Sequence, residues 1–246
     1  MDDFWGITIL LFIILTLFVA FIVRVMAYYK KYRLVRHERV RMTDRFGTLK
    51  SGDIILFIAH THGFTNSLFT GDLYTHSGMV VELGGELFLS EATVDSLPSP
   101  VTGEEEGLPE TAQVNPLIPR LKHYPGMLFL MQLKRRLTPS QEEILRERIL
   151  EETPYPSMVQ MLKAIFRIPV HRKARHCMQH VAWLLDEMGL TPDDLAENGD
   201  TLLGTGFFHS SRAVTTLPGR ALGPAGTNAY GPVYELLFDA DALPLT

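Results

Sequence analysis

The stretch THSGMVVELGGELFLSEAT, residues 75–93, decides the fold class of this chain. Apolar and β-branched residues dominate both sides of Gly84-Gly85, and a glycine pair between two such runs predicts a tight turn. The stretch therefore predicts a β-hairpin. The outer ends of an antiparallel hairpin are neighbours, so we expect a cross-strand contact between His76, near its start, and Glu91, near its end.

The rest of the chain extends this hairpin into an α+β pattern, with strands first, helices after them, and one strand that returns near the C-terminus. Thr138 is expected to be a helix N-cap, because Pro139 follows it and Gln141 completes a capping box. Residues 94–120, rich in Pro and Glu, predict an exposed insertion. Strands are predicted over 51–58, 75–83, 86–93, 127–135 and 231–238, and helices over 138–152, 155–166, 177–188 and 191–197.

The composition is that of a globular protein. A length of 246 residues, 46% of them hydrophobic and 21% charged, indicates one domain with additional segments. Cys177 is the only cysteine, which excludes a disulfide within the chain. A reducing compartment therefore fits the sequence better than an oxidising one.

The N-terminal region contains an apolar run without charge, FWGITILLFIILTLFVAFIV over 4–23. A helix of this length spans about 30 Å, the thickness of the hydrocarbon core of a membrane. A cleaved signal peptide begins with basic residues, whereas this chain has Asp2 and Asp3 there. The sequence therefore predicts a retained transmembrane helix.

A basic segment follows the apolar run. Residues 24–50 carry nine Lys and Arg against Glu38 and Asp44, a net charge of +7. The positive-inside rule predicts a single-pass membrane protein with its N-terminus outside and its C-terminal domain in the cytosol. No nucleic-acid motif accompanies the charges, so membrane lipids are the expected partner and nucleic acid is not. The predicted parts are a transmembrane helix over 1–26, a basic juxtamembrane stalk over 27–50 and a folded domain over 51–246.

Cys177 lies in the segment RHCMQHVAWLLDEMGL, and two interpretations of it are open. It shares one helical stripe with Val181, Leu184 and Met188, as a small buried core residue would. It is also predicted to begin a helix, directly after the basic residues of 171–176. The helix dipole and a neighbouring positive charge both lower a thiol pKa and favour the nucleophilic thiolate.

Four segments in this order, GDIILF, YTHSGMVVE, LFLSEAT and HCMQHVAWLL, resemble the circularly permuted NlpC/P60 group of papain-like cysteine enzymes, which includes YiiX-like and lecithin:retinol acyltransferase-like proteins. The resemblance covers residues 51–240 and implies a papain-like domain in which an antiparallel sheet packs on helices. It also implies a catalytic triad with Cys177 as nucleophile, His76 as base and Glu91 as the polar third member. The group contains peptidases, amidases and lipid acyltransferases.

Two histidines beside the cysteine, His176 and His180, do not belong to the pattern of that group. They leave a different proton partner for Cys177 open. For the oxyanion of an acyl-transfer reaction, the backbone N–H of Cys177 is the expected donor, and Tyr74 is a weaker candidate.

The predicted function is that of a membrane-anchored cysteine hydrolase that cleaves an amide or ester bond in a peptide or acyl substrate, with no cofactor and no metal. A lipid or protein acyltransferase or deacylase would use the same thioester intermediate, and a non-catalytic membrane-tethered scaffold would keep the fold without the reaction. A zinc site is a further alternative, because Cys177 with His180 and His60 with His62 could supply four ligands.

Overall fold

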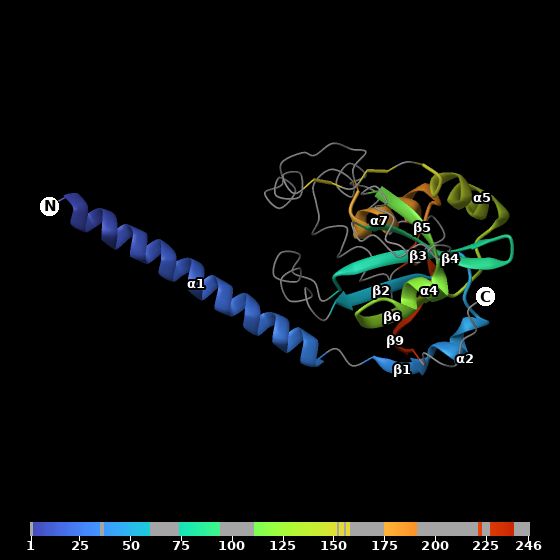
Figure 1. Ribbon diagram of the computed structural model, residues 1–246, viewed down its shortest axis with the longest axis horizontal. Helices are drawn as coiled ribbons and strands as arrows, with labels where there is room; N and C mark the ends of the chain where they lie inside the picture. The colour runs from blue at the N-terminus through green and yellow to red at the C-terminus, as the bar shows by residue number, and fades with distance from the viewer. Residues whose placement is uncertain are drawn as a thin grey trace.

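We describe the protein from a computed structural model, in which residues 2–34, 37–59, 74–93, 111–151, 153–154, 156–157, 175–190, 221–222 and 227–238 are described. Figure 1 shows the long helix α1 extending away from a sheet with helices packed on it. The helices are α1 (Asp2–Leu34), α2 (Met42–Phe46), α4 (Leu117–Lys122), α5 (Pro139–Arg148) and α7 (Cys177–Glu187). The strands are β1 (Glu38–Arg41), β2 (Ile54–Ala59), β3 (His76–Leu83), β4 (Glu86–Thr93), β5 (Thr111–Pro116), β6 (Gly126–Leu133), β7 (Ala221–Leu222), β8 (Thr227–Asn228) and β9 (Tyr230–Leu237).

One seven-stranded sheet organises the domain, in the order β1-β9-β6-β2-β3-β4-β5, within an α+β fold. Each neighbouring pair is antiparallel except β1 and β9, which run parallel. The sheet is therefore mixed, and the prediction of an antiparallel sheet is wrong at this edge. The cause is β1, whose charged sequence ERVR carries no strand pattern; its Arg39 forms an ion pair with Glu235 of β9 at 3.0 Å. Both β1 and α2 come from the segment predicted as a stalk.

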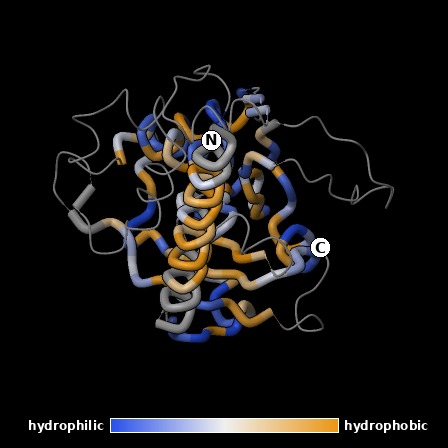
Figure 2. Tube along the Cα trace, turned by 90° about the vertical axis from the view of Figure 1, so that its left-hand side faces the viewer, coloured by the Kyte–Doolittle hydropathy of each residue, from blue (hydrophilic) through white to orange (hydrophobic). Residues whose placement is uncertain are grey.

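The prediction of a transmembrane helix over 1–26 is also wrong. In the part of the chain that the structure describes, no helix is long and apolar enough to cross a membrane. The described side chains in the apolar part of α1 are those of residues 8–16 and 18–23. These side chains are exposed, and Figure 2 shows the apolar stretch of the helix that they form. The predicted single-pass topology, with the N-terminus outside and the C-terminal domain in the cytosol, required this span, so that prediction is wrong as well.

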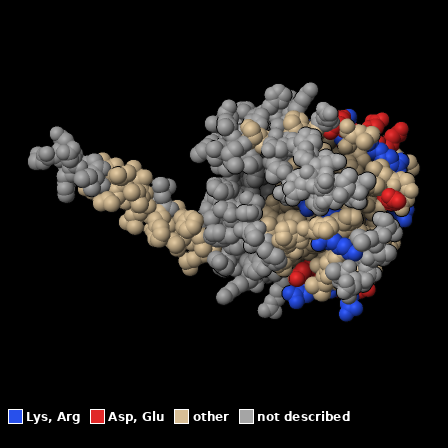
Figure 3. Space-filling model, in the orientation of Figure 1, with Lys and Arg blue, Asp and Glu red and all other residues tan. Residues whose placement is uncertain are grey.

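Two apolar clusters pack against the two faces of the sheet. Alternate residues of β2 divide between them, since successive side chains of a strand point to opposite faces. One cluster joins Ile54, Leu56 and Ile58 of β2 to α5 and α7, and the other joins Ile55 and Phe57 to α2 and α4. In the view of Figure 3, the described charged side chains gather at the end of the molecule away from α1.

Two predicted segments have a clear outcome. The capping box at the start of α5 is confirmed, because the Gln141 backbone donates to Thr138 Oγ1 and the Thr138 backbone donates to Gln141 Oε1. The insertion predicted over 94–120 is wrong for its second part, which forms β5 and α4. Its first part, the helix predicted over 191–197 and nearly all of the helix predicted over 155–166 lie outside the described residues.

The hairpin of β3 and β4 forms as predicted, but its strands separate before they end. Their pairing runs from Leu83↔Glu86 to Met79↔Ser90. Beyond this last pair, the remaining residues of β3 pair only with β2, and those of β4 pair only with β5. Helix α7 packs on both strands, so its N-terminus lies near the place where they part.

Candidate active site

His76 and Glu91 are in direct contact, as the hairpin predicted. His76 Nε2 lies 2.5 Å from Glu91 Oε2. The two residues are not opposite one another, because continuing the register past Met79↔Ser90 would set Gly78 against Glu91. The contact is therefore made diagonally, between residues two positions apart along the hairpin.

The carboxylate of Glu91 is completely buried and is bonded on both oxygens. Its Oε1 accepts from Arg120 Nε at 2.5 Å and from Asn115 Nδ2 at 3.0 Å. Its Oε2 accepts from Arg120 Nη2 at 2.9 Å and contacts His76 Nε2. A carboxylate has about four lone-pair positions, so this arrangement fills them and fixes the plane of the group.

Arg120 and Asn115 are site residues that the sequence did not identify. Both fall in the segment predicted as an exposed insertion. A signal was present, because Arg120 lies three residues after Leu117 and next to Leu121, on the apolar side of α4, and it is only 3% exposed. A buried arginine needs an anionic partner, which the structure supplies as Glu91.

Cys177 is the first residue of α7 and is 7% exposed. Gln179 fixes this helix start, since its Oε1 accepts from the His176 backbone N–H at 3.2 Å. Cys177 and His76 are neighbours, and each shifts the pKa of the other through charge and hydrogen bonding. Because His76 Nε2 is directed at Glu91, the other ring nitrogen, Nδ1, is left to face the thiol.

Burial and charge act in opposite directions on the three predicted residues. Burial raises the pKa of the Cys177 thiol, but the charge of His76, with the neighbouring His176, lowers this pKa to about 5. Burial lowers the pKa of His76, but the Cys177 charge and hydrogen bond, with Glu91, raise it to about 9. Burial raises the pKa of Glu91, but His76 and Arg120 lower it to about 2. Near neutral pH the favoured state is therefore a thiolate beside an imidazolium, with Glu91 ionised.

The two histidines next to the cysteine have different environments. His176 is a neighbour of the thiol and lowers its pKa, so Cys177 has two histidine neighbours. His180 is fully buried, its Nε2 lies 2.9 Å from Ser90 Oγ, and burial with the charge of Arg175 lowers its pKa to about 3. His180 is therefore a neutral ring bonded to β4.

Of the basic flank that the sequence placed before Cys177, the structure describes Arg175 and His176. Residues 171–174 lie outside the described part of the chain. The Arg175 guanidinium lies 3.6 Å from the centre of the Trp183 ring, and its Nη1 donates to Thr153 Oγ1 at 3.1 Å. The thiol pKa is lowered by His76 and His176, one of which comes from a distant strand.

Of the two expected oxyanion donors, Tyr74 is the one whose hydroxyl is already engaged. Its oxygen lies 2.8 Å from His37 Nε2, and its ring packs in the core. The backbone N–H of Cys177 is in the first turn of α7, where amides have no partner within the helix. This amide stays the better candidate.

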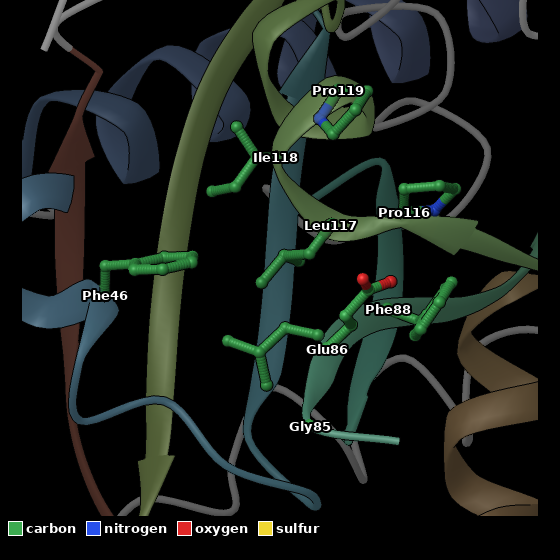
Figure 4. Close-up of a pocket in the computed structure, with 9 residues that line it drawn as sticks. Phe46, Gly85, Glu86, Phe88, Pro116, Leu117, Ile118 and Pro119 are labelled. Carbon is green, nitrogen blue, oxygen red and sulfur yellow. The ribbon is translucent and has the colours of Figure 1, made fainter. Parts of the chain in front are cut away.

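Neither metal binding nor the pocket of Figure 4 involves the predicted triad. Among the described residues no group of three or more His, Cys, Asp and Glu could hold a metal ion, and His60 and His62 lie outside those residues. Figure 4 shows a pocket of about 370 Å³ that is lined by none of the predicted site residues. Its lining residues come from α2, the β3–β4 turn, β4, β5 and α4: Phe46, Gly85, Glu86, Leu87, Phe88, Pro116, Leu117, Ile118 and Pro119.

Comparison with known proteins gives a distant structural resemblance. No family model matches the chain, and no curated protein matches it. A crystal structure of the metalloprotein yiiX from Escherichia coli O157:H7, DUF1105, is similar to 56% of this chain and 66% of its own, with 18% sequence identity and a TM-score of 0.41. The chain thus spans just under two thirds of that protein, and the similarity indicates a distant relation only.

Proposed function

We propose that this protein is a thiol hydrolase that cleaves an amide or ester bond through a thioester on Cys177. The observation that supports this proposal is an unbroken chain of side-chain contacts from the Cys177 thiol through His76 to Glu91. A nucleophile, a base and a group that orients the base are the parts that such a reaction needs.

The reaction follows from the protonation states. The Cys177 thiolate attacks the substrate carbonyl carbon and forms a C–S bond, and the oxyanion accepts the backbone N–H of Cys177. The His76 imidazolium gives its proton to the leaving nitrogen or oxygen as the original bond to the carbonyl carbon breaks. Water then attacks the thioester, and His76 takes a proton from it. The C–S bond breaks, and the carboxylic acid product leaves the thiolate and imidazolium restored.

Glu91 acts through His76. Its Oε2 holds His76 Nε2 at 2.5 Å, which directs Nδ1 toward the thiol in both halves of the reaction. The same thioester can pass its acyl group to an acceptor other than water, and the product would then be that of an acyltransferase.

The test is the reactivity of the thiol. The rate at which Cys177 of the full-length protein reacts with an aromatic disulfide is measured against pH. We expect a midpoint near 5, where the thiolate forms. A midpoint at the ordinary value of about 8.5 would show an unactivated thiol and leave the scaffold as the better hypothesis.

A second measurement identifies the bond that is cleaved. Mass spectrometry of Cys177 after incubation with cell lysate is expected to find an acyl adduct. A peptidyl adduct indicates a peptide or isopeptide substrate, and a fatty-acyl adduct indicates a lipid or lipidated substrate.

A further inference from the structure

The buried carboxylate at the centre of the site is bonded to two cationic groups. Arg120 and His76 both contact Glu91, and His76 also contacts Cys177. These four residues form one charged cluster. With the proton on His76, the cluster holds two positive and two negative charges. With the proton on Cys177, it holds one of each. The net charge is therefore zero on both sides of the proton transfer.

We infer that Arg120 is a positioning residue for this site: its two-pronged contact fixes Glu91, and its charge cancels the carboxylate, so that the proton moves between Cys177 and His76 in a cluster without net charge. The inference rests on the proposed function and adds to it a residue that neither the sequence pattern nor the resemblance supplied.

The geometry supports the orienting part of this role. Glu91 Oε2 is shared by Arg120 Nη2 and His76 Nε2, so a rotation of the carboxylate would break both contacts. The Arg120 guanidinium lies 5.7 Å from the centre of the Phe57 ring, and that ring lies 5.1 Å from the ring of His76. Arg120 and His76 are therefore held by the same carboxylate and packed against the same aromatic ring.

A purely structural role for Arg120 would not require its positive charge, whereas the inferred role does. Without this charge, the buried cluster would carry a net negative charge, and both the thiol and the imidazolium would release their protons at higher pH. Without the charge of Glu91, the cluster would be positive, and both protons would leave at lower pH. The other titratable or charged groups near the pair, which stay constant between such variants, are His180 of α7 and, before that helix, Arg175 and His176.

The experiment compares reaction midpoints of Cys177 with an aromatic disulfide in full-length variants. Arg120→Met is expected to raise the midpoint by about one pH unit, and Glu91→Gln to lower it by about one unit. The double variant removes one charge of each sign, so its midpoint is expected to return toward the wild-type value. Arg120→Lys keeps the charge without the planar fork, so it is expected to keep the midpoint but react more slowly. Arg135→Met, which removes an exposed arginine, is the matched control and is expected to change nothing.

The two single variants are expected to shift the midpoint in opposite directions, and this makes the result decisive. Shifts of the same sign in the two single variants, or an unmoved midpoint in Arg120→Met, would overturn the inference. If Arg120→Met does not fold, as judged by circular dichroism, Glu91→Gln and the double variant carry the test: a double variant that keeps the full downward shift of Glu91→Gln would overturn it. An ordinary midpoint in the wild type would instead refute the proposed function, so the two failures are distinguishable.

Discussion

Replacing His76 with Gln tests the proposed proton partner most directly. The change removes the positive charge that lowers the pKa of Cys177, while the burial that raises this pKa remains. We therefore expect the titration midpoint of the thiol to move from about 5 toward the ordinary value of about 8.5. The size of the rate change depends on the pH of the measurement, because two effects oppose one another.

The thiolate fraction is the first effect. At about pH 5.5 it falls from about 76% to about 0.1% between these two pKa values, a loss of roughly 760-fold. The second effect is intrinsic reactivity: a thiolate of higher pKa is the better nucleophile, and a slope of about 0.45 over about 3.5 pKa units returns roughly 40-fold. The net loss is roughly 20-fold at about pH 5.5, whereas at about pH 7 the two effects nearly cancel.

The assay must therefore record a full profile, from about pH 4 to about pH 10, with an aromatic disulfide and full-length protein. His123→Gln, which changes an exposed histidine, is the matched control and is expected to keep the wild-type profile. A His76→Gln profile that coincides with the wild-type profile would refute the assignment of His76. If His176→Gln then moved the midpoint, the proton partner would be the histidine next to the cysteine.

Three further predictions concern stability. Ser90→Ala removes the partner of the buried His180 Nε2 and is expected to lower the free energy of unfolding by about 1–3 kcal/mol in chemical denaturation; an unchanged value would contradict this. Gly126→Ala would set a Cβ 2.3 Å from a backbone oxygen of β2 and is expected to cost about 1–3 kcal/mol or more, whereas Gly47→Ala, with nothing within 4 Å, is the control and should cost little. Glu91 has a folded pKa of about 2, below its ordinary value of 4.5, so its contribution is present above about pH 4.5 and is lost as the pH falls through about 2. The stability difference between wild type and Glu91→Gln should shrink over that range, and a constant difference would count against the buried ionised carboxylate.

The contact between His76 and Glu91 was predictable because a tight turn fixes the register of a hairpin. The start of α7 at Cys177 was predictable from the apolar stripe that follows it. In both cases the information is local, within about twenty residues of sequence.

The residues that escaped prediction depend on distant partners. Arg120 and Asn115 acquire their meaning from Glu91, and the Pro- and Glu-rich sequence before them indicated a loop. The strand β1 is polar and lies at a sheet edge, and the strand that it pairs with, β9, is almost two hundred residues away. The point at which the β3–β4 pairing ends has no local sequence signal that we can identify. Beyond it, β3 pairs only with β2 and β4 pairs only with β5.

The hairpin of β3 and β4 and the helix α7 together place the residues of the proposed site. Ser90 belongs to the last residue pair before the two strands part, and its hydroxyl contacts His180, which lies one helical turn after Cys177. Helix α7 is thus bonded to the sheet where the β3–β4 pairing ends. Its first residue, Cys177, is a neighbour of His76, which follows that last pair along the hairpin. In the continued register Gly78 would be opposite Glu91 and His76 would lie two residues further along the same face, which is the diagonal spacing of the observed contact. The hairpin register therefore brings the strand histidine and the strand carboxylate together, and α7 adds the cysteine to form one connected cluster.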